Sequence, residues 1–247
     1  TYVKLQSGYA IGTSQEYLYS SDYSGDQYSS KVHPYSMGKG FAYGANVGHL
    51  FTSNFGVELG LSFLKGAEMT TTNKGFDGNN DDHTMASKSS NLSLSQLYQA
   101  DNDGLKPYAK MGFLASSAVL TSSYAAAAGT YSTNRSWAYK SSGGIQIGFT
   151  SGIGVSKQIN DKISIFGEGV FNIISFKPKK SVQTASTEDG KDKLTGLQTY
   201  YKENEYVDEI TWEDNDEDPD LDKPSVEIGE AWAMSSISFN VGIKITL

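Results

Sequence analysis

Cysteine is absent from this 247-residue chain, and its absence excludes a disulfide framework and any cysteine-ligated zinc site. Proline is scarce as well, with 5 residues, whereas glycine occurs 26 times and tyrosine 16 times. A chain rich in glycine and tyrosine is typical of strands joined by turns rather than of helices. We therefore expect an all-β protein.

Long hydrophobic runs are missing too. No stretch of about 18 apolar residues occurs, which excludes a transmembrane helix on length, and the mean hydropathy is -0.41. A spanning β-strand needs only about 9 to 11 residues in which every second side chain is apolar. A β-barrel could therefore cross a membrane although its sequence is hydrophilic on average. The chain starts at Thr1 without a charged and then apolar leader, so we expect that any export signal has been removed.

Apolar side chains alternate with small or polar ones in eight segments. In the segment 55–64, for example, Leu59 and Leu61 share one face, and Glu58 and Gly60 share the other. This period of two predicts strands with one apolar and one polar face. The predicted strands are 2–12, 41–51, 55–64, 91–98, 109–115, 145–155, 163–176 and 232–247, and the alternation is weakest in 91–98.

The connections between these strands are alternately short and long. Short turns lie near Ser53, Asp103 and Asp161, and the long connections are 20–38, 66–90, 124–141 and 177–231. Bacterial outer-membrane barrels have short periplasmic turns and longer external loops. We therefore expect one domain, residues 1–247, that forms an eight-stranded antiparallel up-and-down transmembrane β-barrel with long extracellular loops and both termini in the periplasm. A soluble β-sandwich is the alternative, but it would leave the apolar face uncovered.

Three stretches resemble the repeated hairpins of small OmpA-like outer-membrane barrels, particularly those of Bacteroidota. They are Gly40 to Phe63, Lys106 to Leu114 and Ile163 to Phe176, so the resemblance covers strands and not loops. It implies a Gram-negative cell-surface protein. The last residue in that family is usually an aromatic that the assembly machinery reads, whereas this chain ends in Leu247.

Five charged residues fall on the polar faces of the predicted strands at similar heights. They are Lys4, Glu58, Lys110, Glu168 and Lys244. The interior of an eight-stranded barrel is just wide enough for side chains to fill it, so these charges should meet across the lumen. We interpret them as a buried ionic plug, and the alternative is a gate that rearranges to pass small ions.

The acidity of the chain belongs to one predicted loop. Residues 177–231 hold 16 acidic residues and 7 lysines, a net charge of -9, whereas the rest of the chain has a net charge of +1. Its densest part includes Asp214, Asp216, Asp218, Asp220 and Asp222. An EF-hand register from Asp214 would put Pro219 at the obligatory glycine, so that motif fails. The loop could still bind Ca²⁺ or a basic partner, and otherwise we expect no cofactor.

Tyrosines crowd two of the predicted loops. They are Tyr17, Tyr19, Tyr23, Tyr28 and Tyr35 in the first, and Tyr200, Tyr201 and Tyr206 in the fourth, where Trp212 also lies. Amphipathic rings of this kind suit contact with a protein or a glycan. They equally suit interlocking loops or the membrane headgroup region.

Signals of catalysis are weak. Of three histidines, His83 follows Asp81 and Asp82, an order that resembles the Asp and His of omptin proteases, but those barrels are larger and have ten strands. No serine lies in a G-x-S-x-G motif. We therefore expect a protein that is not an enzyme.

Three functions follow from these patterns. The leading hypothesis is a non-enzymatic barrel that presents surface loops, as an envelope-stabilising or adhesin-like protein or as an accessory subunit of a larger outer-membrane complex. The alternative is a narrow porin-like channel for ions or small solutes, and the third is a barrel enzyme. The expected partners are outer-membrane lipid and lipopolysaccharide, and another outer-membrane protein or a surface ligand, but no nucleic acid.

Overall fold

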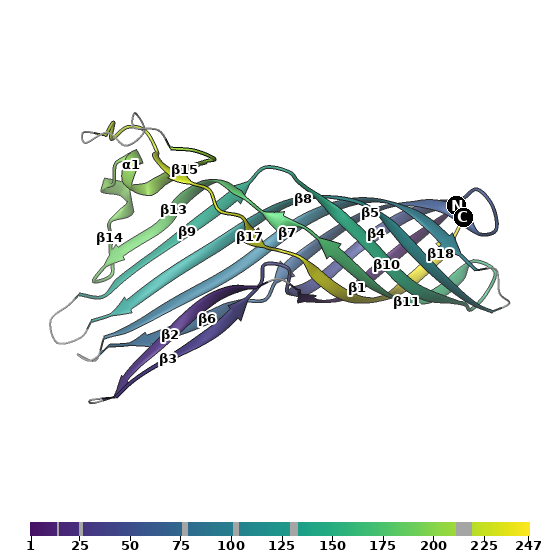
Figure 1. Ribbon diagram of the computed structural model, residues 1–247, viewed down its shortest axis with the longest axis horizontal. Coiled ribbons are helices and arrows are strands. Elements are labelled where there is room, and N and C mark those ends of the chain that lie inside the picture. The colour runs from purple at the N-terminus through teal and green to yellow at the C-terminus, as the bar shows by residue number, and fades with distance from the viewer. Residues whose placement is uncertain (14, 25–26, 76–78, 101–103, 129–132, 211–218) are drawn as a thin grey trace.

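The computed structural model describes the chain except for residues 14, 25–26, 76–78, 101–103, 129–132 and 211–218. Eight long strands form a closed antiparallel barrel, which confirms the predicted fold class (Figure 1). They are β1 (Tyr2–Gly12), β4 (Gly40–Leu50), β5 (Phe55–Gly66), β7 (Asn80–Gln99), β8 (Leu105–Ala127), β10 (Gln146–Gln158), β11 (Ile163–Ile173) and β18 (Ser236–Thr246). Each strand pairs with the next in this order, and the pairing of β1 with β18 closes the barrel.

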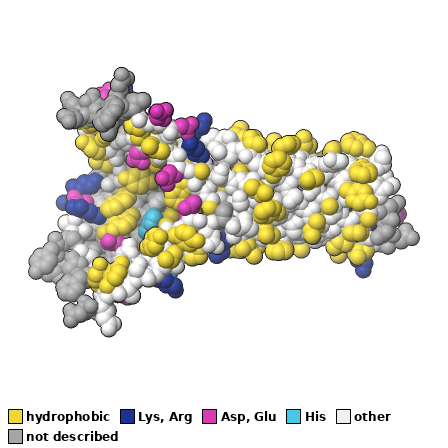
Figure 2. Space-filling view, in the orientation of Figure 1, with side chains coloured by type: hydrophobic (Ala, Val, Ile, Leu, Met, Phe, Trp, Pro, Cys, Tyr) yellow, Lys and Arg dark blue, Asp and Glu magenta, His cyan; other side chains and the backbone are white. Residues whose placement is uncertain are grey.

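The barrel has an apolar outer surface and a packed interior, as the period of two predicts. Leu59 of β5 is 50% exposed, whereas its neighbour Glu58 is 3% exposed. In Figure 2 hydrophobic side chains are spread over the barrel, and charged side chains gather at the end remote from the chain termini. Among the described residues, no helix has the length and apolar character needed to cross a membrane.

Short turns join the strands at the end where both termini lie (Figure 1). Between β4 and β5, Phe51 N–H donates to Phe55 O, and the Thr52 hydroxyl accepts from Phe55 N–H. Between β10 and β11, the Asn160 side chain accepts from Lys162 N–H and Ile163 N–H. The predicted turn at Asp103 falls outside the described residues.

The long connections are largely strands rather than loops. β7 and β8 continue well beyond the barrel, so the predicted strand 91–98 is only the inner half of β7. Serines and alanines occupy both faces of these extensions, so apolar alternation did not mark them. The added strands are β2 (Glu16–Ser24), β3 (Gln27–Tyr35), β6 (Met69–Lys74), β9 (Arg135–Gly143), β13 (Pro178–Glu188), β14 (Lys191–Asp192), β15 (Glu203–Val207) and β16 (Ser225–Ile228), with η1 (Leu194–Gly196) and α1 (Thr199–Lys202).

These added strands and the ends of β7 and β8 form one open sheet, which we call the distal sheet. Its order is β16-β15-β13-β9-β8-β7-β6-β2-β3, with β14 paired to β13, so β3 and β16 are its edges. The sheet curves away from the barrel, with β2, β3 and β6 on one side and β9, β13 and β15 on the other (Figure 1).

The predicted strands 163–176 and 232–247 are each interrupted. β11 ends at Ile173, and β18 starts at Ser236. The short strands β12 (Ser175–Phe176) and β17 (Trp232–Ala233) form a separate pair. Ser235 bridges the break, because its hydroxyl accepts from Ile174 N–H and donates to Ile174 O.

Candidate functional site

An ion-pair network lies inside the barrel, near the end with the short turns. Lys4 Nζ lies 2.7 Å from a Glu58 oxygen, and Lys110 Nζ lies 2.9 Å from Glu58 and 3.0 Å from Glu168. A longer contact of 3.9 Å joins Lys4 to Glu168. β1, β5, β8 and β11 supply one residue each, and all four side chains are at most 7% exposed. The structure thus brings four of the five predicted lumen charges together.

Lys244 does not join this network. Its Nζ donates to the side-chain oxygen of Gln99 at 3.2 Å and lies 4.2 Å from the centre of the Tyr2 ring. The physical reason is its register, because Lys244 is the direct cross-strand partner of Lys4. Like charges that lie opposite each other repel. Lys4 therefore pairs with the Glu58 carboxylate, whereas Lys244 contacts the Gln99 amide and the Tyr2 ring. The expectation that all five charges meet was therefore wrong for Lys244.

Two tyrosine hydroxyls also bond to the carboxylates of the network, from the side of the short turns. Tyr2 donates to Glu58 and Tyr108 donates to Glu168, both at 2.9 Å. Both rings pack with Leu97 in a small apolar cluster at the short-turn end. Lys4 Nζ lies 4.3 Å from the centre of the Tyr108 ring. These contacts give the buried carboxylates donors besides the lysines, which a buried ion pair needs to offset its lost hydration.

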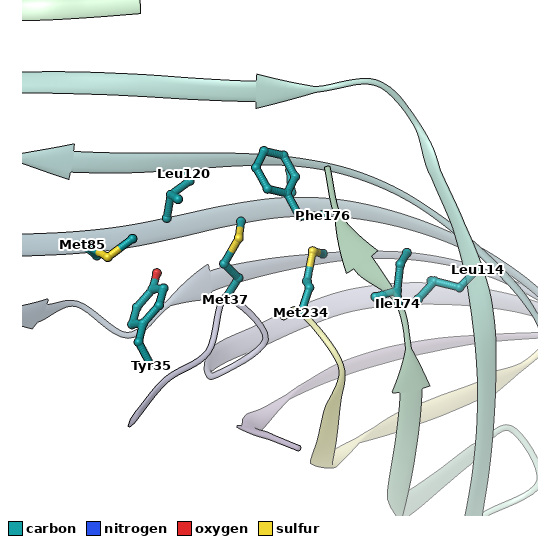
Figure 3. Close-up of a cluster of buried hydrophobic side chains, with 9 residues drawn as sticks. Tyr35, Met37, Met85, Leu114, Leu120, Ile174, Phe176 and Met234 are labelled. Carbon is teal, nitrogen blue, oxygen red and sulfur yellow. The ribbon is translucent and has the colours of Figure 1, made fainter. Parts of the chain in front are cut away.

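A second seal closes the other end of the lumen and was not predicted from the sequence. Met37 in the β3–β4 connection is 1% exposed and Phe176 of β12 is 0% exposed. Figure 3 shows Met37 and Met234 among side chains from the surrounding strands. Met37 N–H donates to Ala233 O at 3.1 Å, and the Ser87 hydroxyl donates to Met37 O at 2.9 Å. Nothing periodic marks Met37 or Met234, because both lie between strands of the barrel.

A small polar chamber separates the two seals. Its volume is about 70 Å³. Serine and asparagine side chains such as Asn46 and Asn240 line its wall, Lys110 and Glu168 lie at one end, and Met234 lies at the other. The lumen is therefore closed at two levels, with room for only a few water molecules between them.

His83 lies on the inner face of the distal sheet, where its Nε2 is 2.8 Å from the Ser122 hydroxyl. Burial lowers the pKa of His83. Asp82 instead accepts from Thr72, and Asp81 bonds with Tyr124, whose pKa burial and this bond raise to about 12. Within the part of the chain that is described, no carboxylate is paired with His83. A histidine and a serine without an orienting carboxylate lack the third member of a hydrolase triad.

The crowded tyrosines divide between two environments. Tyr17, Tyr19 and Tyr28 are 59%, 61% and 59% exposed on the β2–β3 hairpin, whereas Tyr35 is 2% exposed and belongs to the seal around Met37. The rings of Tyr23 and Tyr28 lie 4.7 Å apart. Tyr200 and Tyr201 contact each other edge to face. Trp212 falls outside the described residues.

The acidic run is only partly described. Asp214, Asp216 and Asp218 fall outside the described residues, so the Ca²⁺ prediction stays a prediction. Asp220 pairs with Lys223 at 3.1 Å and accepts from Asp222 N–H. These contacts lower the pKa of Asp220. Across the described residues there is no group of three or more histidine or acidic side chains suited to a metal ion.

One family model and two solved structures are similar to the chain. The family model described as "Outer membrane protein beta-barrel domain" matches residues 2–200. Comparison with curated proteins gives no match. Among solved structures, Ail of Yersinia pestis is 10% identical with a TM-score of 0.32, over 99% of this chain and 98% of that chain. CarO2 of Acinetobacter baumannii is 13% identical with a TM-score of 0.35, over 99% of both chains.

The two structural likenesses carry no argument about function, because both TM-scores are low. The family match is different, since it spans most of the chain, including seven strands of the closed barrel. The chain therefore belongs to the outer membrane protein β-barrel domain family and is an outer-membrane β-barrel protein.

Proposed function

We propose that this protein is a non-conducting, non-enzymatic barrel that holds the distal sheet outside the cell for contact with another molecule. It would act as an envelope-stabilising or adhesin-like protein, or as an accessory subunit of a larger outer-membrane complex. The observation that carries the proposal is the closure of the lumen at two levels, by the ion-pair network and by the seal around Met37. A barrel whose lumen is closed at two levels suits a membrane anchor better than a channel for ions or solutes.

The layout of the connections supports one orientation of the barrel in the membrane. Short turns and both termini lie at one end, and we place that end in the periplasm because outer-membrane barrels carry their short turns there. The distal sheet then projects from the cell. Lipid surrounds the apolar face of the barrel, and lipopolysaccharide lies beside the base of the distal sheet.

The distal sheet has features that suit contact with a partner. Its edge strands β3 and β16 are unpaired on one side among the described residues. Tyr17, Tyr19 and Tyr28 present exposed rings on the hairpin that carries one of these edges. Aromatic residues of this kind are enriched in protein interfaces. We also propose that the protein is one of the small OmpA-like barrels of Bacteroidota, which three of its strand segments resemble.

A gated pore is the second candidate, because the chamber between the seals is polar. Leaving one partner of a buried ion pair uncompensated costs about 3–5 kcal/mol, so we expect the ion-pair network to open rarely. Catalysis is the third candidate. Protease or lipase activity of the purified barrel that His83→Ala abolishes would support it.

Single-channel recording in planar bilayers decides between an anchor and a pore. We expect no steady conductance from the wild type, because both seals are closed. Lys110→Ala should add at most brief openings, since the seal around Met37 remains, and Lys140→Ala is a control on the exposed surface of β9. Steady wild-type conductance that Lys110→Ala or Glu168→Ala changes would overturn the proposal in favour of the pore.

A further inference from the structure

A pocket of about 190 Å³ lies where the distal sheet meets the mouth of the barrel. Strand pairing assembles it from distant parts of the chain. Phe176 and Trp232 are direct partners in β12 and β17, and Gly229 N–H donates to Val207 O at 2.9 Å. A Cβ atom at position 229 would lie 3.1 Å from Tyr206 Cβ, so glycine lets this segment pack closely against the base of the Tyr206 side chain.

Three aromatic side chains line the pocket. Phe176 is fully buried, whereas Tyr206 and Trp232 are half-buried. The side chains of Ser181 and Asn204 interact with the Tyr206 hydroxyl. The face of an aromatic ring carries negative charge density, which attracts a cation placed over it.

The same pocket carries one carboxylate, that of Glu230. Glu230 has no ion pair within the described ranges, and the nearby Lys177 is already paired with Asp208. The surrounding segment 177–231 has a net charge of -9. An unpaired carboxylate beside aromatic rings in an acidic segment favours a positively charged ligand over a neutral or anionic one.

Apolar groups narrow the class of that ligand further. Leu120, Pro178 and Ile228 also line the pocket, so a hydrocarbon stem would be covered while its charged head reaches Glu230. A metal ion is a poor fit, because a single carboxylate supplies too few ligands. We propose that this pocket binds an alkylammonium group, supplied by a lysine side chain of a protein partner. This inference rests on the proposed function of the distal sheet in protein contact.

Isothermal titration of the full chain in detergent micelles with N-acetyl-lysine-methylamide tests the proposal. We expect saturable binding, and about tenfold weaker binding of N-acetyl-norleucine-methylamide, which has a similar stem without the charge. Glu230→Gln should weaken lysine binding by about tenfold and Glu230→Asp should retain most of it. Glu205→Gln is the matched control, because Glu205 is an exposed carboxylate of β15 that does not line the pocket.

Several results would overturn the inference. If the norleucine compound binds as tightly as the lysine compound, and Glu230→Gln leaves the affinity unchanged, the pocket is simply apolar. Binding of tetramethylammonium but not of the lysine compound would mark a site for small quaternary amines. A lack of any binding while Tyr206→Leu, Glu230→Gln and the wild type all fold would also refute it, and heat-modified mobility on gels reports that folding. None of these outcomes bears on whether the barrel conducts ions, so the titration and the single-channel recording test the two proposals separately.

Discussion

At the scale of single residues, the two kinds of buried lysine in the lumen differ in their partners. Lys110 contacts both carboxylates of the network, whereas Lys244 contacts an amide and a ring. The five charged residues of the lumen are three lysines and two glutamates, so one lysine has no glutamate to balance its charge. Removing Lys110 should therefore affect the electrostatics of the lumen differently from removing Lys244.

We predict that Lys110→Met and Lys244→Met change the stability of the barrel differently. Lys110→Met leaves Glu58 and Glu168 short of a partner, and should lower the free energy of unfolding by about 3–5 kcal/mol. Lys244→Met removes a charge opposite Lys4 and should be neutral or stabilising. Urea unfolding in lipid vesicles, followed by tryptophan fluorescence, measures both. Equal losses in the two variants would contradict the network as described.

At the scale of elements, the glycines of the barrel strands have different roles on the two faces. A side chain at Gly242 of β18 would collide with Leu5 O and with the Phe166 ring. A side chain at Gly169 of β11 would meet only the Phe239 ring at 4.0 Å, on the lipid-facing side. Close packing thus requires glycine at position 242 and does not require it at position 169.

We therefore expect Gly169→Ala to stabilise the barrel by about 0.5–1 kcal/mol, because glycine weakens a strand through its backbone freedom. Gly242→Ala should destabilise it by about 1–3 kcal/mol, since the added methyl overpacks the interior. The same urea titration measures both variants. Destabilisation by Gly169→Ala would show that the lipid-facing position is needed for something other than strand packing.

At the scale of the whole molecule, the absence of cysteine makes the orientation directly measurable. Ser30→Cys places a thiol on the exposed strand β3, and Asp161→Cys places one in a short turn. On intact cells, a maleimide that cannot cross membranes should label the first variant and not the second. Permeabilising the outer membrane should allow both to react. Labelling of position 161 alone on intact cells would reverse the proposed orientation.

The sequence by itself determined the eight barrel strands and the faces of their residues, because alternation along a strand is a local property. It also placed Lys4, Glu58, Lys110 and Glu168 inside the barrel, where they lie. It did not reveal the distal sheet, since the small polar residues of β7 and β8 alternate without an apolar signal.

Only the tertiary structure decided which side chains meet. Strand register set Lys244 against Lys4 and so kept it out of the network. The Met37 seal and the Glu230 pocket join residues that are far apart in the sequence, through connections without periodicity. Contacts of this kind depend on how the closed barrel and the curved sheet bring separate segments together, which no pattern along one segment records.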